Sequence, residues 1–529
     1  MSELLHELVA RSAQKSPTAP AVHYRGQTLH YAELDAQVSQ LAAALVSADL
    51  LANERVAVYL PKRFETVVAL FGASRAGGVF VPVNPLLKAE QACYILQDCN
   101  VRILVTSHDR ARLLIEYFPD LPDLHTVVMI DAANKEELSH PHIRFVRWED
   151  FNLPADTQAL GHSRIDTDMT AILYTSGSTG KPKGVVLSHR NMVTGAKSVA
   201  SYLKNTADDR LLAVLPFSFD YGLSQLTTAF HVGASAVLMD YLFPKDVVNI
   251  VAKEKITGLA AVPPLWAQVA DLDWPAEAKQ SLRYITNSGG AMPGKVLASL
   301  RQQLPGTEVY LMYGLTEAFR SSYLPPHEVD KRPDSMGKAI PNAELMVVRE
   351  DGTPCAPNEP GELVHRGSLV AMGYWNDPGK TAERFKPAPN RLAELPLQEI
   401  AVWSGDTVRM DEQGFLYFVG RKDDMIKTSG YRVSPTEVEE VVYSTGLVKE
   451  AAALGLPHPS LGQGILVAVT APDGEELDTS KIMHTCKQHL ANFMVPQHIE
   501  VIEYMPKNPN GKIDRKKLAQ DFDNFFGAE

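Results

Sequence analysis

One short segment, residues 174–184, constrains this chain more than any other. It reads Tyr-Thr-Ser-Gly-Ser-Thr-Gly-Lys-Pro-Lys-Gly, and apolar runs stand on both sides of it, at residues 171–173 and 185–187. Glycines allow successive backbone N–H groups to converge on one anion, hydroxyls add hydrogen-bond donors, and a lysine adds positive charge. The segment is therefore typical of a loop that holds a polyphosphate. Its apolar flanks place it inside a folded unit and argue against a flexible Gly/Ser linker.

The spacing in this loop is not that of a Walker A motif, G-x-x-x-x-G-K-[ST], in which a second glycine stands five positions after the first. Here Pro182 occupies the position five residues after Gly177. The candidate phosphate-binding residues carry a hydroxyl or a charge, and glycines shape the backbone between them. They are Thr175, Ser176, Ser178, Thr179 and Lys183, with Gly177, Gly180 and Gly184.

The bulk properties are those of a multidomain globular protein. With 529 residues the chain exceeds one compact core, and 45% hydrophobic and 22% charged residues are ordinary values. The net charge of −12, with no basic domain, argues against a nucleic-acid partner. No apolar run is long enough to predict a membrane span. The polar N-terminus lacks the regions of a signal peptide, so a cytoplasmic location is expected.

The four cysteines are expected to be reduced thiols with a structural role. Cys93 and Cys99 stand six positions apart, while Cys355 and Cys486 are isolated. No second cysteine pair or histidine pair accompanies the first two, as a zinc site requires.

The first four hundred residues alternate between short apolar runs and helical patterns. Three runs are predicted to be buried strands: residues 56–60, 101–106 and 126–130. Between the first two, residues 64–71 have helical spacing, with a stop at Gly77 and Gly78. Strand–helix alternation predicts parallel sheets covered by helices. Residues 361–366 and 414–419 alternate without long helices between them, which indicates a more antiparallel piece or a small barrel.

A domain boundary is predicted near residue 420, giving domains 1–419 and 420–529. Ser434 and Glu437 form a capping-box pattern with Pro435 at the first helical position, so a helix should begin at about Pro435. A strand at residues 466–470 and a helix at 481–492 should follow. The second domain would then have an ordinary small size.

Five segments together resemble a known superfamily. They are the loop at 174–184, Tyr-Gly-Leu-Thr-Glu at 313–317, Ser-Gly-Asp at 404–406, residues 420–432 and Asn-Gly-Lys-Ile-Asp at 510–514. Their order and spacing resemble the adenylate-forming enzymes: acyl-CoA synthetases, amino-acid adenylation domains and firefly-type luciferases. The chain also resembles, more loosely, ligases found with bacterial exosortase-type surface systems.

This resemblance implies a fold and a reaction. The implied α/β fold has a large N-terminal domain of helix-covered parallel sheets plus a small barrel, and a small mobile α+β C-terminal domain. The implied enzyme is an AMP-forming ligase that activates a carboxylic acid with ATP and Mg²⁺. The acyl group then passes to a thiol of CoA or of a phosphopantetheinylated carrier protein acting in trans.

The resemblance also assigns roles to individual residues. Besides the loop residues, the nucleotide contacts are Gly290 and Ala291 at the adenine amino group, Tyr313 against adenine, and Asp406 and Arg421 at the ribose. The catalytic residues are Glu317 as the Mg²⁺ ligand, Thr316 at the α-phosphate, and Lys512 between the α-phosphate and the carboxylate. Asp423 matches a hinge, and Gly430 and Arg432 match the segment that faces the site in the second step.

The residues themselves support some of these roles. Glu317 follows a strand-like run at 309–314, and ligands of α/β sheets bind where strands end. The Asn-Gly turn before Lys512 displays that lysine at a loop tip. Taken alone, Tyr313 would be a core aromatic, Lys512 a surface charge and Asp406 a turn residue, but the surrounding motifs outweigh these alternatives.

One position departs from the usual acyl-CoA ligase pattern. Phe219 stands where many of those enzymes carry histidine, and Asp220 follows it, as in amino-acid adenylation domains. A buried acid needs a partner, which a substrate ammonium would supply. Alternatively, Asp220 caps a helix that begins near Tyr221. Further substrate-pocket candidates are Ser288, Met312 and Leu315.

Two alternatives for the function stay open beside the acid–thiol ligase. An amino-acid-activating ligase would load a carrier protein in trans and use Asp220 to bind the substrate ammonium. A luciferase-like oxidoreductase would share the fold and the adenylation step and differ in its acceptor. A degenerate nucleotide-binding protein is disfavoured because Glu317, Asp406 and Lys512 are all present.

Overall fold

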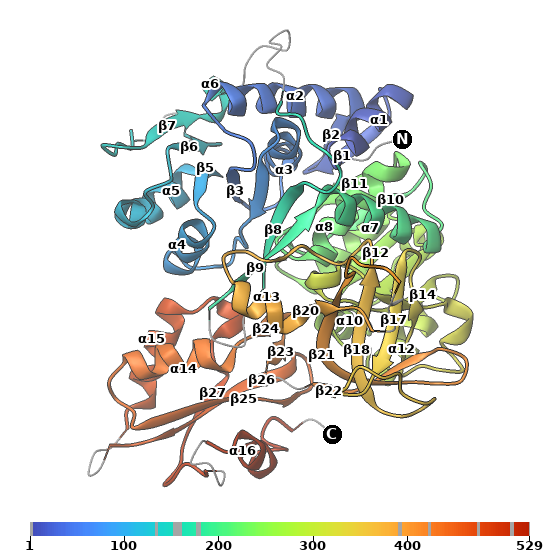
Figure 1. Cartoon of the computed structure of the whole chain (residues 1–529), viewed down its shortest axis with the longest axis vertical. Helices are drawn as coiled ribbons and strands as arrows, with labels where there is room; N and C mark the ends of the chain where they lie inside the picture. The colour runs from blue at the N-terminus through green and yellow to red at the C-terminus, as the bar shows by residue number, and fades with distance from the viewer. Residues whose placement is uncertain are drawn as a thin grey trace.

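The computed structural model describes residues 4–132, 136–151, 161–175, 181–389, 394–421, 425–472, 477–507 and 513–527 of the chain. Figure 1 shows a large body that holds most of the elements and a smaller body near the C-terminus. The predicted α/β fold with a large N-terminal and a smaller C-terminal part is confirmed. The predicted boundary after residue 419 falls inside a strand that continues to Arg421.

An eight-stranded sheet contains the three strands that the apolar runs predict. Its order is β19 (Gly373–Tyr374), β9 (Lys183–Ser188), β8 (Met169–Thr175), β4 (Val79–Pro82), β3 (Arg55–Tyr59), β5 (Val101–Thr106), β6 (Thr126–Met129) and β7 (Arg144–Arg147). From β8 to β7 neighbouring strands are parallel. The predicted helix is α3 (Phe64–Ala76), and Gly77 ends it in the left-handed region at φ 83°.

A 14-stranded sheet combines a parallel part with an antiparallel extension. Its order is β17 (Ala343–Val348), β18 (Gly361–Gly367), β21 (Ile400–Met410), β22 (Leu416–Arg421), β16 (Ser335–Ala339), β15 (Ser322–Leu324), β14 (Glu308–Tyr313), β13 (Tyr284–Asn287), β12 (Gly258–Ala261), β10 (Arg210–Ala213), β11 (Ser235–Leu238), β1 (Pro20–Tyr24) and β2 (Gln27–His30), with β20 (Phe385–Pro387) beside β21. In this sheet the neighbouring strands β1, β11, β10, β12, β13 and β14 pair in parallel. The remaining strands pair antiparallel with their neighbours. The predicted antiparallel piece is therefore an extension of the main sheet.

Helices cover both sheets and share one core between them. They are α1 (Glu7–Lys15), α2 (Tyr31–Ser47), α4 (Ala89–Asp98), α5 (His108–Leu114), α6 (Trp148–Phe151), α7 (His189–Tyr202), α8 (Asp220–Val232), α9 (Pro244–Lys253), α10 (Pro263–Val269), α11 (Ala276–Ser281), α12 (Gly294–Gln303) and α13 (Pro378–Arg384), with short turns η1 (Ile115–Asp120), η2 (Thr316–Ala318) and η3 (Pro326–Glu328). Phe71 of α3 and Phe230 of α8 meet edge to face with ring centroids 5.2 Å apart. Burying each such ring stabilises the fold by roughly 1.5–3 kcal/mol, so this contact ties the two layers together.

The C-terminal body is built on a five-stranded sheet. Its order is β24 (Tyr431–Val433), β23 (Ile426–Thr428), β26 (Gly462–Thr470) and β25 (Glu450–His458), with β27 (His498–Val501) beside β26. Its helices are α14 (Pro435–Ser444), α15 (Thr479–His489), η4 (Asn492–Met494) and α16 (Arg515–Asp521). Within the described parts of the chain, no helix has both the length and the apolarity needed to cross a membrane.

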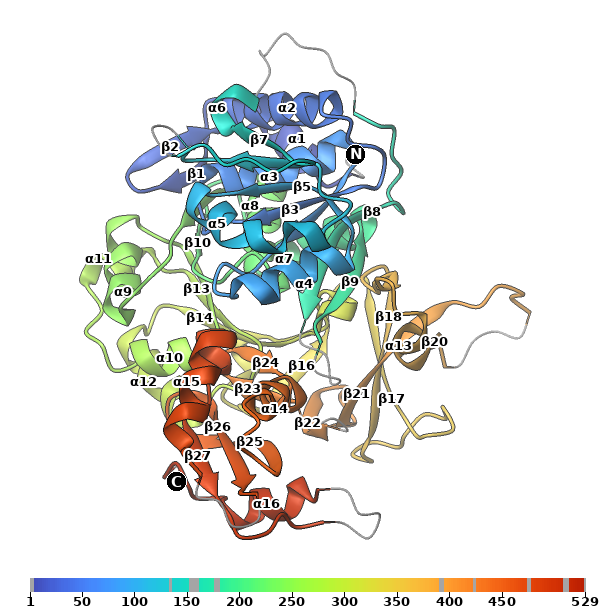
Figure 2. The ribbon, with the colours of Figure 1, turned by 90° about the vertical axis from the view of Figure 1, so that its left-hand side faces the viewer.

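The helix α14 begins at Pro435 as predicted, but the predicted capping box is wrong. Ser434 makes no side-chain capping bond. Glu437 instead accepts a hydrogen bond from Gln91 Nε2 of α4, at 3.2 Å. The glutamate therefore serves the contact between the two bodies, which Figure 2 shows joined at one end of the large body.

Candidate active site

The carboxyl end of β14 leads directly to a buried acid. The strand ends at Tyr313, and Glu317 in η2 is only 9% exposed. Its carboxylate accepts a hydrogen bond of 2.7 Å from the hydroxyl of Tyr374. Its backbone oxygen accepts another, 2.8 Å long, from the N–H of Ala371. Glu317 is therefore held in one orientation, and its charge is one reason, after burial, why the pKa of Tyr374 is raised.

The glycine-rich loop leaves and rejoins the eight-stranded sheet beside this acid. Thr175, the last residue of β8, is the register partner of Lys183, the first residue of β9. Lys183 Nζ lies 5.3 Å from the centre of the Tyr374 ring. Burial, Lys380 and Arg384 lower the pKa of Lys183, while Glu317 opposes them. The loop residues Ser176, Gly177, Ser178, Thr179 and Gly180 lie outside the described residues.

Tyr313 and Asp406 meet although 93 positions separate them. The tyrosine hydroxyl donates a hydrogen bond to the carboxylate of Asp406, which is 1% exposed. Behind them His365 of β18 is 2% exposed and stacks on Tyr313 with centroids 6.1 Å apart. Burial lowers the pKa of His365 to about 4, so the ring is neutral at physiological pH. Arg421 is the backbone register partner of Asp406 in β22.

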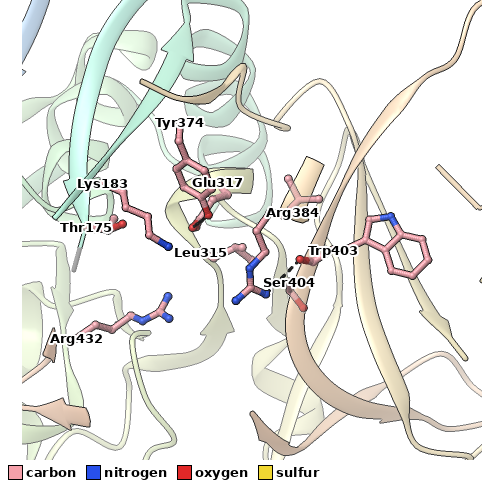
Figure 3. Close-up of a pocket in the computed structure, with 10 residues that line it drawn as sticks. Thr175, Lys183, Leu315, Glu317, Tyr374, Arg384, Trp403, Ser404 and Arg432 are labelled. Atoms are coloured by element: carbon pink, nitrogen blue, oxygen red, sulfur yellow. Dashed lines mark hydrogen bonds between the residues drawn. The ribbon is translucent and has the colours of Figure 1, made fainter. Parts of the chain in front are cut away.

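These segments border one pocket, drawn in Figure 3. Its lining residues are Thr175, Lys183, Leu315, Glu317, Tyr374, Arg384, Val402, Trp403, Ser404 and Arg432. Figure 3 shows Lys183 and Arg432 on one side, Arg384 beside Ser404 on the other, and Glu317 between them. The structure thus brings together four of the five segments that the sequence singles out.

The C-terminal body reaches this pocket through the hairpin β23–β24. Gly430 in its turn has φ 81°, and a Cβ at this position would lie 2.6 Å from the side chain of Val262. Glycine is therefore required for the hairpin to approach the large body so closely. This approach brings Arg432 into the pocket lining. Asp423 and Lys512 lie outside the described residues.

The predicted adenine strip follows β13. Ser288 is 4% exposed, and Asn287 Nδ2 donates a hydrogen bond of 2.9 Å to the backbone oxygen of Gly290. That bond holds the strip in place, with Ala291 exposed after it. Among the other substrate candidates, Leu315 lines the pocket, whereas Met312 Sδ lies 3.2 Å from the hydroxyl of Tyr202 within the core.

Asp220 has a partner inside the protein. Its carboxylate lies 4.0 Å from Arg320 Nη1, and the two side chains are 6% and 4% exposed. Burial raises the pKa of Asp220, and Arg320 is the main group that opposes this shift. The arginine also lies over the ring of Tyr221, 4.5 Å from its centre. The alternative in which Asp220 caps a helix beginning near Tyr221 is wrong, because α8 begins at Asp220 itself and its N-cap is Phe219.

Sequence reasoning missed three residues here: Tyr374, Arg320 and Arg384. All three stand outside the motifs that carry the resemblance, although Arg320 follows only three positions after Glu317. Tyr374 is 57 positions from Glu317, and Arg320 is 100 from Asp220, so no local pattern links the partners. Only the three-dimensional fold reveals these contacts.

The one acid that lines the described part of the pocket, Glu317, fits a magnesium ion that is bound mainly by phosphates. Among the described residues, no group of three or more His, Cys, Asp or Glu side chains could hold a metal by itself. Mg²⁺ usually takes one or two carboxylates, several waters and substrate phosphates. A single buried, oriented carboxylate such as Glu317 meets that requirement beside Lys183 and Thr175.

Solved structures share this fold along nearly the whole chain. An amide bond synthetase from Marinactinospora thermotolerans superposes with a TM-score of 0.85 at 23% identity, covering 97% of this chain and 99% of that one. An o-succinylbenzoate CoA synthetase from Bacillus subtilis gives 0.81 at 24% identity, covering 97% and 98%. These likenesses show that the chain shares the fold of these two proteins.

Sequence relatives and family matches agree with the fold. A linear gramicidin synthase from Brevibacillus parabrevis is 29% identical over 98% of this chain, which spans only 6% of that protein's length. A long-chain-fatty-acid–CoA ligase from Bacillus subtilis is 27% identical over 98% of this chain and 95% of its own length. Residues 9–375 match the family described as AMP-binding enzyme, and residues 437–512 match its C-terminal domain family. The chain belongs to the AMP-binding enzyme family, and the predicted superfamily is confirmed.

Proposed function

We propose that this protein is an ATP-dependent, AMP-forming acid–thiol ligase. The observation that carries the proposal is the convergence of Lys183, Glu317 and Arg432 on one pocket beside the Tyr313–Asp406 pair. In the first half-reaction a carboxylate oxygen attacks the α-phosphorus of ATP and pyrophosphate leaves. In the second a thiol attacks the acyl carbon and AMP leaves. Both steps depend on positioning and on charge neutralisation rather than on a protein nucleophile.

The chain's residues divide this work by position. Lys183 and Thr175 hold the outer phosphates, together with the glycine-rich loop. Thr316 contacts the α-phosphate, and Glu317 holds Mg²⁺, which when bound neutralises phosphate charge. Asp406 and Arg421 bind the ribose hydroxyls. Tyr313, Gly290 and Ala291 enclose the adenine.

The C-terminal body serves the two half-reactions in turn. Lys512 bridges the α-phosphate and the carboxylate during adenylation, and rotation about Asp423 then withdraws it. Gly430 and Arg432 face the site for thiol transfer. The contact of Gly430 with Val262 and the place of Arg432 in the pocket support assigning the present arrangement to the second step.

The substrate is a carboxylic acid, and Asp220 bears on its class. The ion pair with Arg320 supplies the counter-charge that a substrate ammonium would otherwise have to provide. This observation favours a plain carboxylic acid over an amino acid. The amino-acid alternative, with a carrier protein as acceptor, is supported by the 29% identity to a linear gramicidin synthase.

Substrate-dependent ATP–pyrophosphate exchange tests the proposal. The panel contains fatty, aryl, short-chain and amino acids, each assayed with wild type and Asp220→Ala. Exchange with plain carboxylates that survives in the variant supports the main proposal. Exchange with amino acids alone, with a raised KM in the variant, would establish the alternative. No exchange with any acid would point to nucleotide binding without turnover.

The acceptor is tested in a second assay. Acyl transfer to CoA is compared with transfer to a phosphopantetheinylated carrier protein, using the acid found by exchange. Oxygen uptake in place of thiol acylation would identify a luciferase-like oxidoreductase, and acylation of an amine alone would overturn the thiol assignment.

The Lys512→Ala variant separates the half-reactions. Adenylation should fall by at least about 100-fold, while thiol transfer from preformed acyl-AMP should be largely spared, because the lysine acts only before rotation. Equal loss in both half-reactions would contradict the role of Lys512.

A further inference from the structure

Arg384 is a cation in the pocket that none of the resemblance motifs contains. It is the last residue of α13, and it lies in the stretch 376–436, between the two family matches. The position of Arg384 is set by the residue that follows it. Phe385, the next residue, pairs with Val402 of β21 and packs edge to face against Tyr374 at 5.5 Å. Arg384 is therefore fixed beside the tyrosine that orients Glu317.

The backbone opposite is shaped to admit this side chain. Gly405 has φ 71°, and a Cβ there would lie 2.0 Å from Arg384 Nη1. Any other residue at 405 would displace the guanidinium. Nη1 also donates a hydrogen bond of 3.4 Å to the backbone oxygen of Trp403. Figure 3 shows the guanidinium beside Ser404, which stands two positions before the proposed ribose acid Asp406 in β21.

The charges around it point to an anion. Lys183, Arg384 and Arg432 all line the same pocket, and among the described residues that line it Glu317 is the only acid. Lys183 and Arg384 repel each other. Burial and Lys380 are the larger causes of the lowered pKa of Lys183, and Arg384 lowers it further. Cations gathered in this way are stabilised when a phosphate enters between them.

We propose that Arg384 binds the α-phosphate of the nucleotide, the phosphate that remains in AMP and in the acyl-adenylate. This rests on the proposed function, because it takes the Asp406 side of the pocket as the ribose side. The α-phosphate is the phosphate joined to the ribose, so a cation beside Ser404, close in sequence to Asp406, is placed to contact it. Lys183, across Glu317, then faces the β- and γ-phosphates.

Equilibrium binding to adenosine, AMP and Mg-ATP, measured by calorimetry, tests this assignment. Arg384→Gln should weaken the binding of AMP and ATP by about 10- to 100-fold, since a charge-assisted hydrogen bond to phosphate is lost. The affinity for adenosine should stay unchanged. Lys183→Gln should weaken ATP but leave AMP within about threefold. Arg384→Lys should restore part of the loss. Arg366→Gln, an exposed arginine of β18 paired with Glu344 and Glu399, is the matched control.

Each other outcome has a definite meaning. If Arg384→Gln leaves AMP binding unchanged, the α-phosphate assignment is wrong. If adenosine weakens as much as AMP, or Arg384→Lys behaves like Arg384→Gln with a lowered Tm, Arg384 is structural and the proposal is overturned. If the wild-type protein binds neither AMP nor ATP, the proposed function itself fails. That outcome is read from the wild type alone and is therefore distinct from the outcomes for the Arg384 variants.

Discussion

At the scale of single residues, the site is organised around one hydroxyl. Tyr374 donates to Glu317 at 2.7 Å and offers its ring face to Lys183 Nζ at 5.3 Å. One side chain thus orients the proposed metal ligand and contacts the lysine that we propose to bind phosphate. A buried carboxylate that loses a donor incurs its full desolvation cost.

Tyr374→Phe removes the hydroxyl and keeps the ring. We expect the Mg²⁺ concentration for half-maximal adenylation to rise and kcat to fall, by roughly 10-fold or more, because hydrogen bonds to charged groups contribute about 1.5–3 kcal/mol. Titration of the exchange reaction with Mg²⁺ measures this. Tyr417→Phe removes a hydroxyl that donates to Asp411 at 3.3 Å, away from the pocket, and should change neither value. An unaltered Mg²⁺ profile in Tyr374→Phe would show that the hydroxyl does not orient Glu317.

The Asp220–Arg320 pair allows a second prediction at this scale. Arg320→Met leaves the buried carboxylate uncompensated, which costs about 3–5 kcal/mol of unfolding free energy at neutral pH. Because burial already raises the pKa of Asp220, the carboxyl protonates more readily once the arginine is gone. The loss should therefore be smaller at pH 5 than at pH 8, measured by urea unfolding. Arg301→Met breaks an exposed pair with Asp330 and should cost under about 1 kcal/mol at both pH values.

At the scale of elements, a strained turn aims Arg320 inward. Phe319 follows η2 with φ 53° and ψ −37°, although it is a bulky residue and fully buried. Such a conformation costs of order 1–3 kcal/mol and persists only where its surroundings enforce it. Gly195 of α7 provides the space, since a Cβ there would lie 2.3 Å from the Phe319 ring. Helix α7 and the turn after Glu317 are thus fitted to each other.

Gly195→Ala tests this fit. Ordinarily glycine to alanine inside a helix stabilises by roughly 0.5–1 kcal/mol. Here we expect a net loss of about 1–3 kcal/mol from overpacking, with reduced exchange activity as the turn shifts. Gly294→Ala in α12, where nothing lies within 4 Å of the new Cβ, should not destabilise and should keep full activity. A stable, fully active Gly195→Ala variant would show that the turn at Phe319 can shift to accept the added methyl group without loss, which would contradict the tight fit.

Much of the fold follows from local sequence patterns. Residues 101–106 form β5 as their apolar run predicts, and α3 and α14 begin where their patterns place them. Patterns could not show the Phe319 turn, because the space for its buried ring is left by Gly195, more than a hundred residues earlier. The local pattern also predicts Glu437 as a capping residue. Its actual partner, Gln91, is distant in sequence and meets it only where the two bodies pack together.

At the scale of the whole molecule, the contact between the two bodies contains a poorly compensated acid. Glu437 of α14 accepts a hydrogen bond from neutral Gln91, whose amide also lies 3.3 Å from Met494 Sδ. Burial, with a smaller contribution from the nearby Glu440, raises the pKa of Glu437 to about 7, and the hydrogen bond from Gln91 opposes this shift. At the edge of the contact, His489 Nδ1 lies 3.4 Å from Glu90, and both side chains are exposed.

The raised pKa gives the docked arrangement a pH dependence of known sign. Below about pH 4.5 Glu437 is protonated whether docked or free, so docking carries no ionisation penalty. As pH rises to about 7 the docked form must keep a proton that the free form has lost, and docking weakens by at most about 3 kcal/mol. Förster transfer between dyes on the two bodies should fall from pH 5.5 to 8.5 in wild type and stay high in Glu437→Gln. His489→Gln removes only the exposed pair and should retain the wild-type dependence. If Glu437→Gln undocks with pH as wild type does, another group controls the contact.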